Sequence, residues 1–249
     1  NVYINDLVQE LTDHLPNVQV SCLAYADDIV VMADDESSLQ ELIHICHRWT
    51  TKWRMESKVD HENPKTAVMK IPAQKRRRKQ DVNVAPTTDF LWGNESLPKV
   101  ECYKYLGIIF DNQLNFEKHA KKMEAKASRN LGRVKRHLYD NTAPRSMKIA
   151  LIRAIVMAGA AYGIETWGQD KRHGKTMDTI INEASRVLAK LPKTAAADCC
   201  RTIGGITPLK AIRNSQGKRL VEKIRKMPAS RLSRMALETT QNSENSLAA

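Results

Sequence analysis

Two adjacent aspartates, Asp27 and Asp28, are the residues of this sequence whose type and spacing best suit chemistry. They follow an alternating apolar stretch, 18–24, and precede the β-branched run 29–32. Paired carboxylates repel each other, and apolar neighbours limit their hydration, so a bound divalent cation would remove this penalty. Phosphoryl transfer by two metal ions about 3.5–4 Å apart uses such hard oxygen ligands. The pair therefore indicates either a metal site or a solvated turn, because aspartate favours turns without any ligand.

The pattern around the aspartates predicts the elements that must hold them. Alternation before the pair and a second apolar run after it indicate a β-hairpin with the two carboxylates at its tip. Apolar residues then repeat at helical spacing over 39–53, behind a capping box of Ser37 with Gln40 or Ser38 with Glu41. This helix is expected to pack beneath the hairpin.

Strand signals recur up to about residue 113, and helical signals dominate after it. Residues 66–71 and 103–110 have strand character, and between them a polar excursion, 75–98, contains the apolar run Phe90-Leu91-Trp92. Past Asn115, a predicted N-cap, the apolar residues fall three or four apart. The predicted helices cover 116–138, about 144–162, 177–188 and 209–224, and the polar segment 236–249 is expected to be disordered. The sequence thus predicts an α+β fold class, with an α+β part followed by a mostly helical part.

The charge of the chain is divided unevenly along its length. The total is +12, yet residues 1–62 hold twelve acids and four Lys/Arg, a net of −8, which leaves +20 for the remainder. An acidic part that collects divalent metal, joined to a basic part that follows phosphates, would show this asymmetry. The five cysteines lack metal-binding spacing and are expected to be buried free thiols in a reducing compartment. The most apolar stretch, 149–164, is too short to span a bilayer, so an intracellular protein, nuclear or cytoplasmic, without a membrane partner is expected.

Two stretches carry positive charge of nearly one sign. Residues 118–137 hold eight Lys/Arg and one acid, arranged away from the apolar stripe, and they include Lys122, Lys126, Arg129 and Arg133. A solvated helix face usually mixes signs to gain i,i+4 pairs, so this face favours contact with a phosphate backbone. Residues 201–234, with ten Lys/Arg and one acid, support the same inference more weakly. The basic run 75–79 indicates a nuclear-localisation patch, a template contact or a loop kept soluble by charge.

The order and spacing of several motifs resemble the reverse transcriptase family of non-LTR, LINE-like retrotransposons. The matching segments are Asn1-Val2-Tyr3-Ile4-Asn5-Asp6-Leu7, Tyr25-Ala26-Asp27-Asp28-Ile29-Val30, Asn63-Pro64-Lys65-Thr66, Tyr105-Leu106-Gly107-Ile108 and the later pair Tyr162-Gly163 and Trp167-Gly168. The resemblance extends to about residue 170 and, less closely, to about 228. It implies the end of a right-handed polymerase palm over 1–113, a helical thumb and extension over 114–228, and a disordered tail over 229–249.

The resemblance also implies roles for individual residues. Asp27 and Asp28 match the catalytic, metal-binding pair, with Mg²⁺ or Mn²⁺ as the cofactor, and Tyr25 matches a residue near the primer terminus. Lys65 matches a catalytic position beside the incoming nucleotide, where a lysine could steady the triphosphate or protonate pyrophosphate. An ordinary solvated lysine fits that position as well. Tyr105, Leu106 and Gly107 match the primer grip. At Gly107 the missing side chain would let a nucleic-acid backbone approach, although a glycine in a strand can also mark an ordinary bulge.

RNA-templated DNA synthesis is the function that the resemblance implies for the intact parent protein. Its partners would be an RNA template, a DNA primer and deoxynucleoside triphosphates. The family's palm also uses an aspartate from an earlier strand and a glutamine-glycine segment, and neither has a match in this sequence. The chain by itself is therefore expected to be an inactive fragment. The alternatives are a non-enzymatic nucleic-acid-binding remnant of a decayed element and an RNA-templated RNA polymerase.

Overall fold

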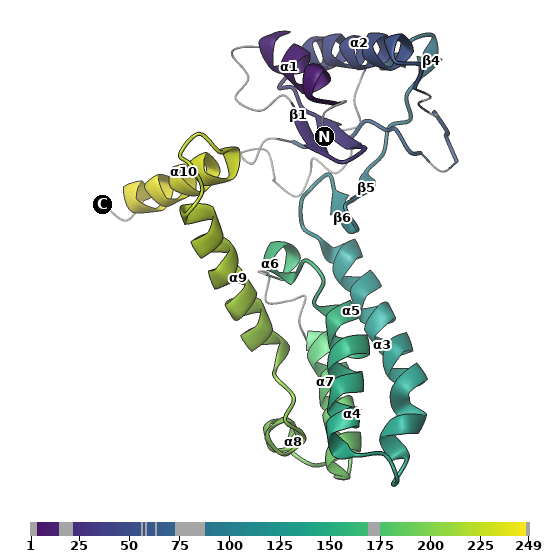
Figure 1. Ribbon diagram of the computed structural model, residues 1–249, viewed down its shortest axis with the longest axis vertical. Coiled ribbons are helices and arrows are strands. Elements are labelled where there is room, and N and C mark those ends of the chain that lie inside the picture. The colour runs from purple at the N-terminus through teal and green to yellow at the C-terminus, as the bar shows by residue number, and fades with distance from the viewer. Residues whose placement is uncertain are drawn as a thin grey trace. The chain divides into compact units, whose positions relative to one another are not determined.

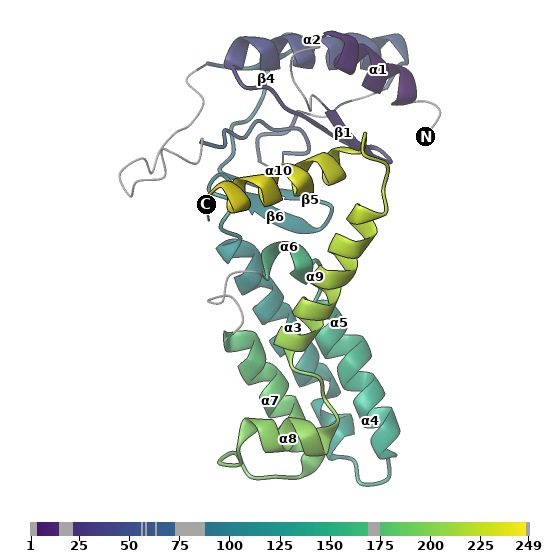
Figure 2. The same ribbon diagram turned by 90° about the vertical axis from the view of Figure 1, so that its left-hand side faces the viewer.

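The computed structural model divides the chain into two compact units, residues 1–115 and 116–249. Figures 1 and 2 show the helices and strands of each unit. The structure describes residues 4–14, 22–55, 57, 59–62, 64–72, 88–168 and 175–247, and in 175–176 and 241–247 only the backbone. The predicted strand residues before Cys22, Asn63 and the basic run 75–79 lie outside the described residues. Within the described part, the first unit combines helices with two-stranded antiparallel sheets, and the second is helical.

A β-hairpin presents the two aspartates, as predicted. β1 (Cys22–Tyr25) pairs antiparallel with β2 (Asp28–Val31), and Tyr25 lies opposite Asp28 at the end of the ladder. Ala26 and Asp27 form the turn, and Ala26 has a φ of 55°. A non-glycine residue in this left-handed region costs roughly 1–3 kcal/mol and persists only when the surrounding structure enforces it. The turn that carries Asp27 is therefore held in place by its two strands.

Two helices cover the hairpin and bury its apolar side. α1 (Asn5–His14) and α2 (Glu36–Lys52) lie side by side in both views and pack on the two strands. Their buried residues are Ile4, Leu7, Leu11, Leu42, Ile45, Cys46 and Trp49, with Cys22, Ile29 and Val31 of the hairpin packed against them. The predicted helix beneath the hairpin is confirmed by α2. α1 was not predicted from the sequence.

The cap of α2 differs from the predicted capping box. Asp35 is the N-cap, and its two carboxylate oxygens accept from the backbone N–H of Ser38 at 2.8 Å and from the Ser38 hydroxyl at 2.7 Å. The bond from the N–H, followed by that from the hydroxyl, lowers the pKa of Asp35. A carboxylate can accept both hydrogens and also faces the positive end of the helix dipole. Asp35 therefore takes the position predicted for Ser37 or Ser38.

The remainder of the first unit contains two short hairpins. β3 (Leu91–Trp92) pairs with β4 (Glu95–Ser96), and β5 (Cys102–Tyr105) pairs with β6 (Ile108–Asp111). A second small core beneath α2 consists of Ile43, Val68, Phe90 and Leu97. This core connects the loop around Val68 to the β3–β4 hairpin.

Two strand predictions in this region need correction. The stretch 103–110 is two strands rather than one, because Leu106 and Gly107, with φ values of 46° and 83°, reverse the chain between them. Residues 66–71 form no strand in the part of the chain that the structure describes. Val68 makes only an isolated parallel bridge to Lys99 there.

The second unit is built on the long amphipathic helix that the sequence predicts for 116–138. α3 (Glu117–Tyr139) buries the stripe of Ala120, Met123, Ala127, Leu131, Val134 and Leu138. Its start differs from the prediction, because Phe116, with a φ of 57°, is the N-cap rather than Asn115. The backbone N–H of Asn115 instead donates to the buried Asp111 carboxylate at 3.1 Å. That carboxylate also accepts from the N–H of Gln113 at 3.0 Å, so it organises the turn before the helix.

The helix predicted for 144–162 consists of three consecutive segments. α4 (Arg145–Leu151) continues into the π-helical segment η3 (Ile152–Met157) and then into α5 (Ala158–Ala160). A π-turn hydrogen-bonds residue i to i+5 and widens the helix locally. The Asn130 side-chain amide of α3 donates to the Ile155 carbonyl within the wide turn, at 2.8 Å.

The remaining helices are α6 (Ile164–Trp167), α7 (Lys175–Ala189), α8 (Ala197–Gly204), α9 (Leu209–Arg225) and α10 (Leu232–Leu247). α7 and α9 confirm predicted helices, and α8 was not predicted. α10 differs from the disordered tail expected over 229–249. Its first turns contain good helix formers, and Glu238 pairs with Arg234 one turn earlier at 2.8 Å. No helix in the described ranges is long and apolar enough to cross a membrane.

The Tyr162-Gly163 and Trp167-Gly168 pair closes the helical core around a buried indole. Trp167 is 2% exposed, its Nε1–H donates to the Tyr162 carbonyl at 2.8 Å, and its ring meets that of buried His119 edge to face at 5.6 Å. At Gly168 an added Cβ would lie 2.5 Å from the Ile164 carbonyl oxygen. This motif thus has a packing role within the second unit.

Candidate functional site

The aspartate pair is exposed at the tip of the first hairpin. Asp27 and Asp28 are both open to solvent, and Tyr25, the residue opposite Asp28, is 65% exposed. The face that carries these side chains is the one that α1 and α2 leave uncovered, since the apolar side of the hairpin packs on those helices. The tip therefore offers hard oxygen ligands beside an exposed aromatic ring.

The β5–β6 hairpin carries two tyrosines whose pKa values respond to the charge of Asp28. Burial raises the pKa of Tyr103 and of Tyr105, and the nearby negative charge of Asp28 raises each pKa further. The charge of Asp28 therefore acts on both phenols. Because Tyr103 and Tyr105 are two residues apart on one strand, they share a face of it.

The loop that carries Lys65 is attached to the same hairpin. The Tyr103 hydroxyl donates a hydrogen bond to the Lys65 backbone carbonyl. The Lys65 side chain is exposed and is thus available to an anion. Tyr103 therefore bonds to the backbone of Lys65, shares a strand face with Tyr105 and responds to the charge of Asp28. These three residues come from separate motifs and were predicted to act together. Tyr103 was not among the predicted site residues, and its i+2 relation to Tyr105 is the sequence signal that could have indicated it.

The turn of the β5–β6 hairpin has a conformation that suits a close approach. Both of its central residues, Leu106 and Gly107, have positive φ, as a two-residue type I′ turn requires. Leu106 is 37% exposed, so the turn is accessible to solvent. Glycine is the residue that adopts such a φ without cost and also leaves room for another backbone.

The ligands available for a divalent metal ion are the two aspartates. Among the residues that the structure describes, no group of three or more His, Cys, Asp and Glu side chains could hold a metal ion. Mg²⁺ typically uses one or two carboxylates, keeps several waters and completes its shell with substrate phosphates. The pair at the tip fits that donor set. Of the five cysteines only Cys46 and Cys200 are buried and Cys199 is exposed, which corrects the expectation that all five are buried.

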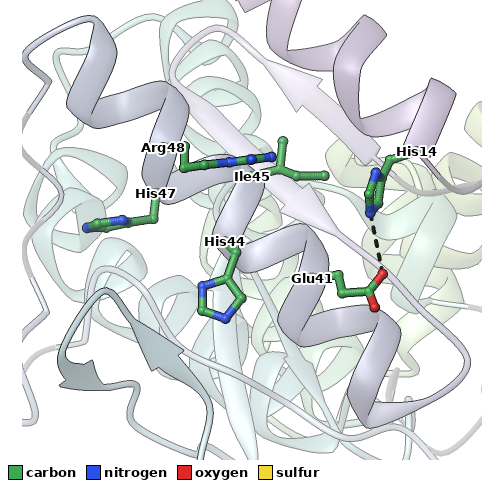
Figure 3. A pocket seen from close by; sticks show the side chains of 6 residues that line it. All are labelled: His14, Glu41, His44, Ile45, His47 and Arg48. Carbon is green, nitrogen blue, oxygen red and sulfur yellow. Dashed lines mark ion pairs between the residues drawn. The ribbon is translucent and has the colours of Figure 1, made fainter.

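A different hollow, on α1 and α2, collects several histidines but has no metal-site geometry. It is lined by His14, Glu41, His44, Ile45, His47 and Arg48. In Figure 3 only His14 and Glu41 face each other, and His14 Nε2 lies 3.4 Å from Glu41 Oε2. His44 and His47 point in other directions (Figure 3), and His47 packs edge to face on Trp92 at 5.5 Å. These side chains have structural contacts of their own.

In the second unit, the predicted basic residues of α3 form one exposed row. Lys122, Lys126, Arg129 and Arg133 are all exposed. At about 100° of rotation per residue, spacings of four, three and four keep them on one face, away from the buried stripe. We refer to these four residues as the α3 basic row. It has the geometry of a positively charged ridge along a single helix.

Comparisons with known proteins relate the chain to one protein family and to two polyproteins. Residues 1–110 match the family model described as reverse transcriptase (RNA-dependent DNA polymerase). The chain is 21% identical over 196 residues, 78% of its length and 56% of the relative's, to the retrovirus-related Pol polyprotein from type-1 retrotransposable element R1 of Nasonia vitripennis. It is 24% identical over 174 residues, 67% of its length and 40% of the relative's, to the corresponding polyprotein from element R1 2 of the same organism.

The first unit thus carries a reverse transcriptase domain match, and most of the chain is similar to Pol polyproteins of R1 non-LTR retrotransposons. The chain spans about half the length of the curated relatives that it matches. No solved structure matches the chain significantly.

Proposed function

We propose that the protein containing this chain is an RNA-directed DNA polymerase of a non-LTR retrotransposon. It would extend a DNA primer on an RNA template by nucleotidyl transfer from deoxynucleoside triphosphates. The observation that supports this most is the convergence on Tyr103, which connects the aspartate hairpin, the Lys65 loop and the β5–β6 turn. We infer that these residues, from Asp27 to Gly107, act as one site, and the family match covers the segment that contains them.

Asp27 and Asp28 would hold Mg²⁺, or Mn²⁺ in its place. When bound, the metal lowers the pKa of the attacking hydroxyl and offsets the charge that develops on the leaving pyrophosphate. The carboxylates contribute a fixed donor geometry, because the strained Ala26 turn and the strand pairing leave Asp27 and Asp28 few alternative positions.

The other residues of the site would bind and orient the substrates. The Lys65 ammonium would contact the triphosphate and hold a proton for the leaving pyrophosphate, while its backbone is anchored by Tyr103. Tyr25 and the exposed turn of Leu106 and Gly107 would contact the primer end. A misplacement of about 1 Å can cost a hundredfold in rate, so this positioning is as important as the metal. The α3 basic row would follow the phosphates of the RNA–DNA duplex.

Primer extension with a matched aspartate control tests the proposal. Asp27→Asn is introduced into the longest natural protein that contains these residues, next to Asp34→Asn, which removes an exposed carboxylate outside the hairpin. We expect Asp27→Asn to abolish extension with Mg²⁺ while leaving duplex affinity nearly unchanged, and Asp34→Asn to extend normally. Extension by Asp27→Asn within tenfold of the parent rate would contradict the proposed role of the pair.

We further propose that residues 1–249 alone bind nucleic acid without polymerising. Two-metal transfer needs carboxylates from more than one strand, and the described residues place no third metal-binding side chain beside Asp27 and Asp28. Purified chain is assayed for extension with Mg²⁺ and with Mn²⁺. Templated extension that disappears in Asp27→Asn would show that the pair suffices. Loss of activity even in the longest natural protein, with binding retained, would favour a nucleic-acid-binding remnant.

A further inference from the structure

A cleft in the second unit lies between the ends of α3 and α7. Its volume is about 710 Å³, which is within the roughly 300–1,000 Å³ of typical small-molecule sites. The side chains that give it its chemical character are Lys135, Tyr139, Asn141, Arg186, Lys190 and Lys193. We refer to it as the α3–α7 cleft. All of these residues belong to one compact unit.

Positive charge dominates the α3–α7 cleft. Four cationic side chains line it, against one carboxylate, Glu183, which is bound to the Lys135 ammonium at 2.7 Å. The guanidinium of Arg186 is fixed in place, because its Nε and Nη2 donate to the Ala195 carbonyl at 3.2 and 3.1 Å. Lys190 and Lys193 are exposed. The cleft therefore presents a surplus of positive charge to an anion that enters it.

An exposed aromatic ring stands at the edge of this charged cleft. Tyr139, in the last turn of α3, is 61% exposed, whereas Leu138 beside it is buried at 2%. A tyrosine face next to lysines is the combination that binds single-stranded nucleic acid, with a base stacked on the ring and the backbone on the cations. A duplex keeps its bases stacked inside and cannot offer a free base to the ring.

The backbone at Lys190 gives an independent indication of function. Lys190 has a φ of 55° and ends α7 with paired hydrogen bonds, from its own N–H to the Val187 carbonyl at 3.2 Å and from the Leu191 N–H to the Arg186 carbonyl at 3.0 Å. This is the Schellman arrangement, in which glycine is the favoured residue at the left-handed position. A lysine there is strained, and strain of this kind accumulates at functional sites.

The same lysine is also directed across the cleft. Its ammonium donates to the Asn141 side-chain carbonyl at 2.8 Å, which joins the end of α7 to the loop after α3. The strained position thus carries a long cationic side chain that is held at the cleft rather than in open solvent.

The α3–α7 cleft is separate from the α3 basic row. Lys135 follows Arg133 by two residues, which at about 100° per residue puts them on nearly opposite sides of the helix. A duplex that contacts the α3 basic row therefore does not reach Lys135 and Tyr139 along the same face.

We propose that the α3–α7 cleft binds a single-stranded nucleic-acid segment, with one base stacked on Tyr139 and the flanking phosphates on Lys190 and Lys193. This site is additional to the proposed duplex contact and does not depend on nucleotidyl transfer. A protein that copies a template strand would use it to hold an unpaired stretch of nucleic acid.

Lys190→Gly separates binding from folding. Glycine removes the ammonium and also relieves the left-handed strain, so the melting temperature should not fall. Affinity for fluorescein-labelled decauridylate, measured by anisotropy on the full chain, should fall, and the log–log salt slope should shrink by about 0.7 for one lost single-strand phosphate contact. Lys52→Gln, which removes one exposed charge from α2 outside the cleft, should leave both unchanged. A lower melting temperature with unchanged affinity would assign Lys190 to the fold and overturn the proposal.

Tyr139 provides a second, independent measurement. Tyr139→Ala should weaken decauridylate binding roughly five- to hundredfold, the range for one lost base stack, whereas Tyr139→Phe keeps the ring and should bind normally. A blunt RNA–DNA duplex of ten base pairs should bind all three proteins equally. An equal loss in both Tyr139 variants, or an equal loss for the duplex, would exclude the stack. Duplex binding depends on the α3 basic row. An absence of duplex binding would therefore count against the proposed function and not against the α3–α7 cleft.

Discussion

Neutralising the α3 basic row is expected to change the salt dependence of duplex binding by a calculable amount. The row runs from residue 122 to 133, and eleven residues at about 1.5 Å each cover about 16 Å along the helix. One strand of a duplex carries a phosphate about every 3.4 Å, so a contact for each of the four side chains is geometrically possible. Each contact contributes about 0.9 to the slope of log affinity against log salt on a B-form duplex, and four contribute about 3.6.

The variant replaces Lys122, Lys126, Arg129 and Arg133 with Gln, and the control keeps the charge by replacing only the two arginines with Lys. Between 50 and 200 mM salt, a slope difference of about 3.6 means that the unmodified chain loses about 150-fold more affinity than the variant. Fluorescence anisotropy with a fluorescein-labelled RNA–DNA hybrid at four salt concentrations measures this. We expect the control to keep the parental slope. If the Gln variant also keeps it, the row does not contact phosphates and the reasoning from helix geometry is wrong.

Three further predictions follow from the packing and electrostatics. Asp28→Asn should lower the pKa of Tyr103 in an absorbance titration, because the substitution removes a negative charge that raises this pKa. Burial is the larger cause and keeps the Tyr103 pKa above its ordinary value in the variant. The free energy of unfolding should therefore still fall as the pH rises from about 10, where the unfolded tyrosine loses its proton first. Gly168→Ala should destabilise the second unit by about 1–3 kcal/mol in urea unfolding, since the new Cβ would lie 2.5 Å from a backbone carbonyl oxygen; an unchanged midpoint would contradict the packing argument. Burial raises the pKa of Cys46 to about 12, so at pH 8 a thiol reagent should label exposed Cys199 quickly and Cys46 only after unfolding.

Local periodicity predicted the elements that hold the candidate site. The alternation before Asp27 is carried by four residues and the three-to-four spacing after Phe116 by more, and both the hairpin and α3 lie where these patterns indicate. Details that depend on one or two side chains were predicted less well. Three residues within four positions can cap a helix, namely Asp35, Ser37 and Ser38. Asp35 is the N-cap because its carboxylate accepts two hydrogens from Ser38, one from the backbone N–H and one from the hydroxyl.

The arrangement of the site could not be predicted from local pattern, because it depends on contacts between distant segments. Tyr103 looks like an ordinary strand residue in sequence, and only folding brings its hydroxyl to the Lys65 carbonyl and exposes its phenol to the charge of Asp28. The same is true of the α3–α7 cleft, whose walls come from helices about fifty residues apart. The roles assigned to Asp27, Asp28 and Lys65 come from family resemblance, and they remain predictions until measured.

The π-helical turn at Ile152–Met157 holds one residue more than a regular α-helix would over the same turns. The extra residue is taken up in the wide turn, so the turns on either side of it keep their own partners. Deleting one residue there would restore a regular i to i+4 ladder and leave the buried Ala160 and Ile164 in the core. The Ile155 carbonyl would instead lose the wide turn in which it accepts from Asn130. This helix is therefore a place where the protein holds an extra residue without shifting its core, so a chain one residue shorter here can keep the same packing.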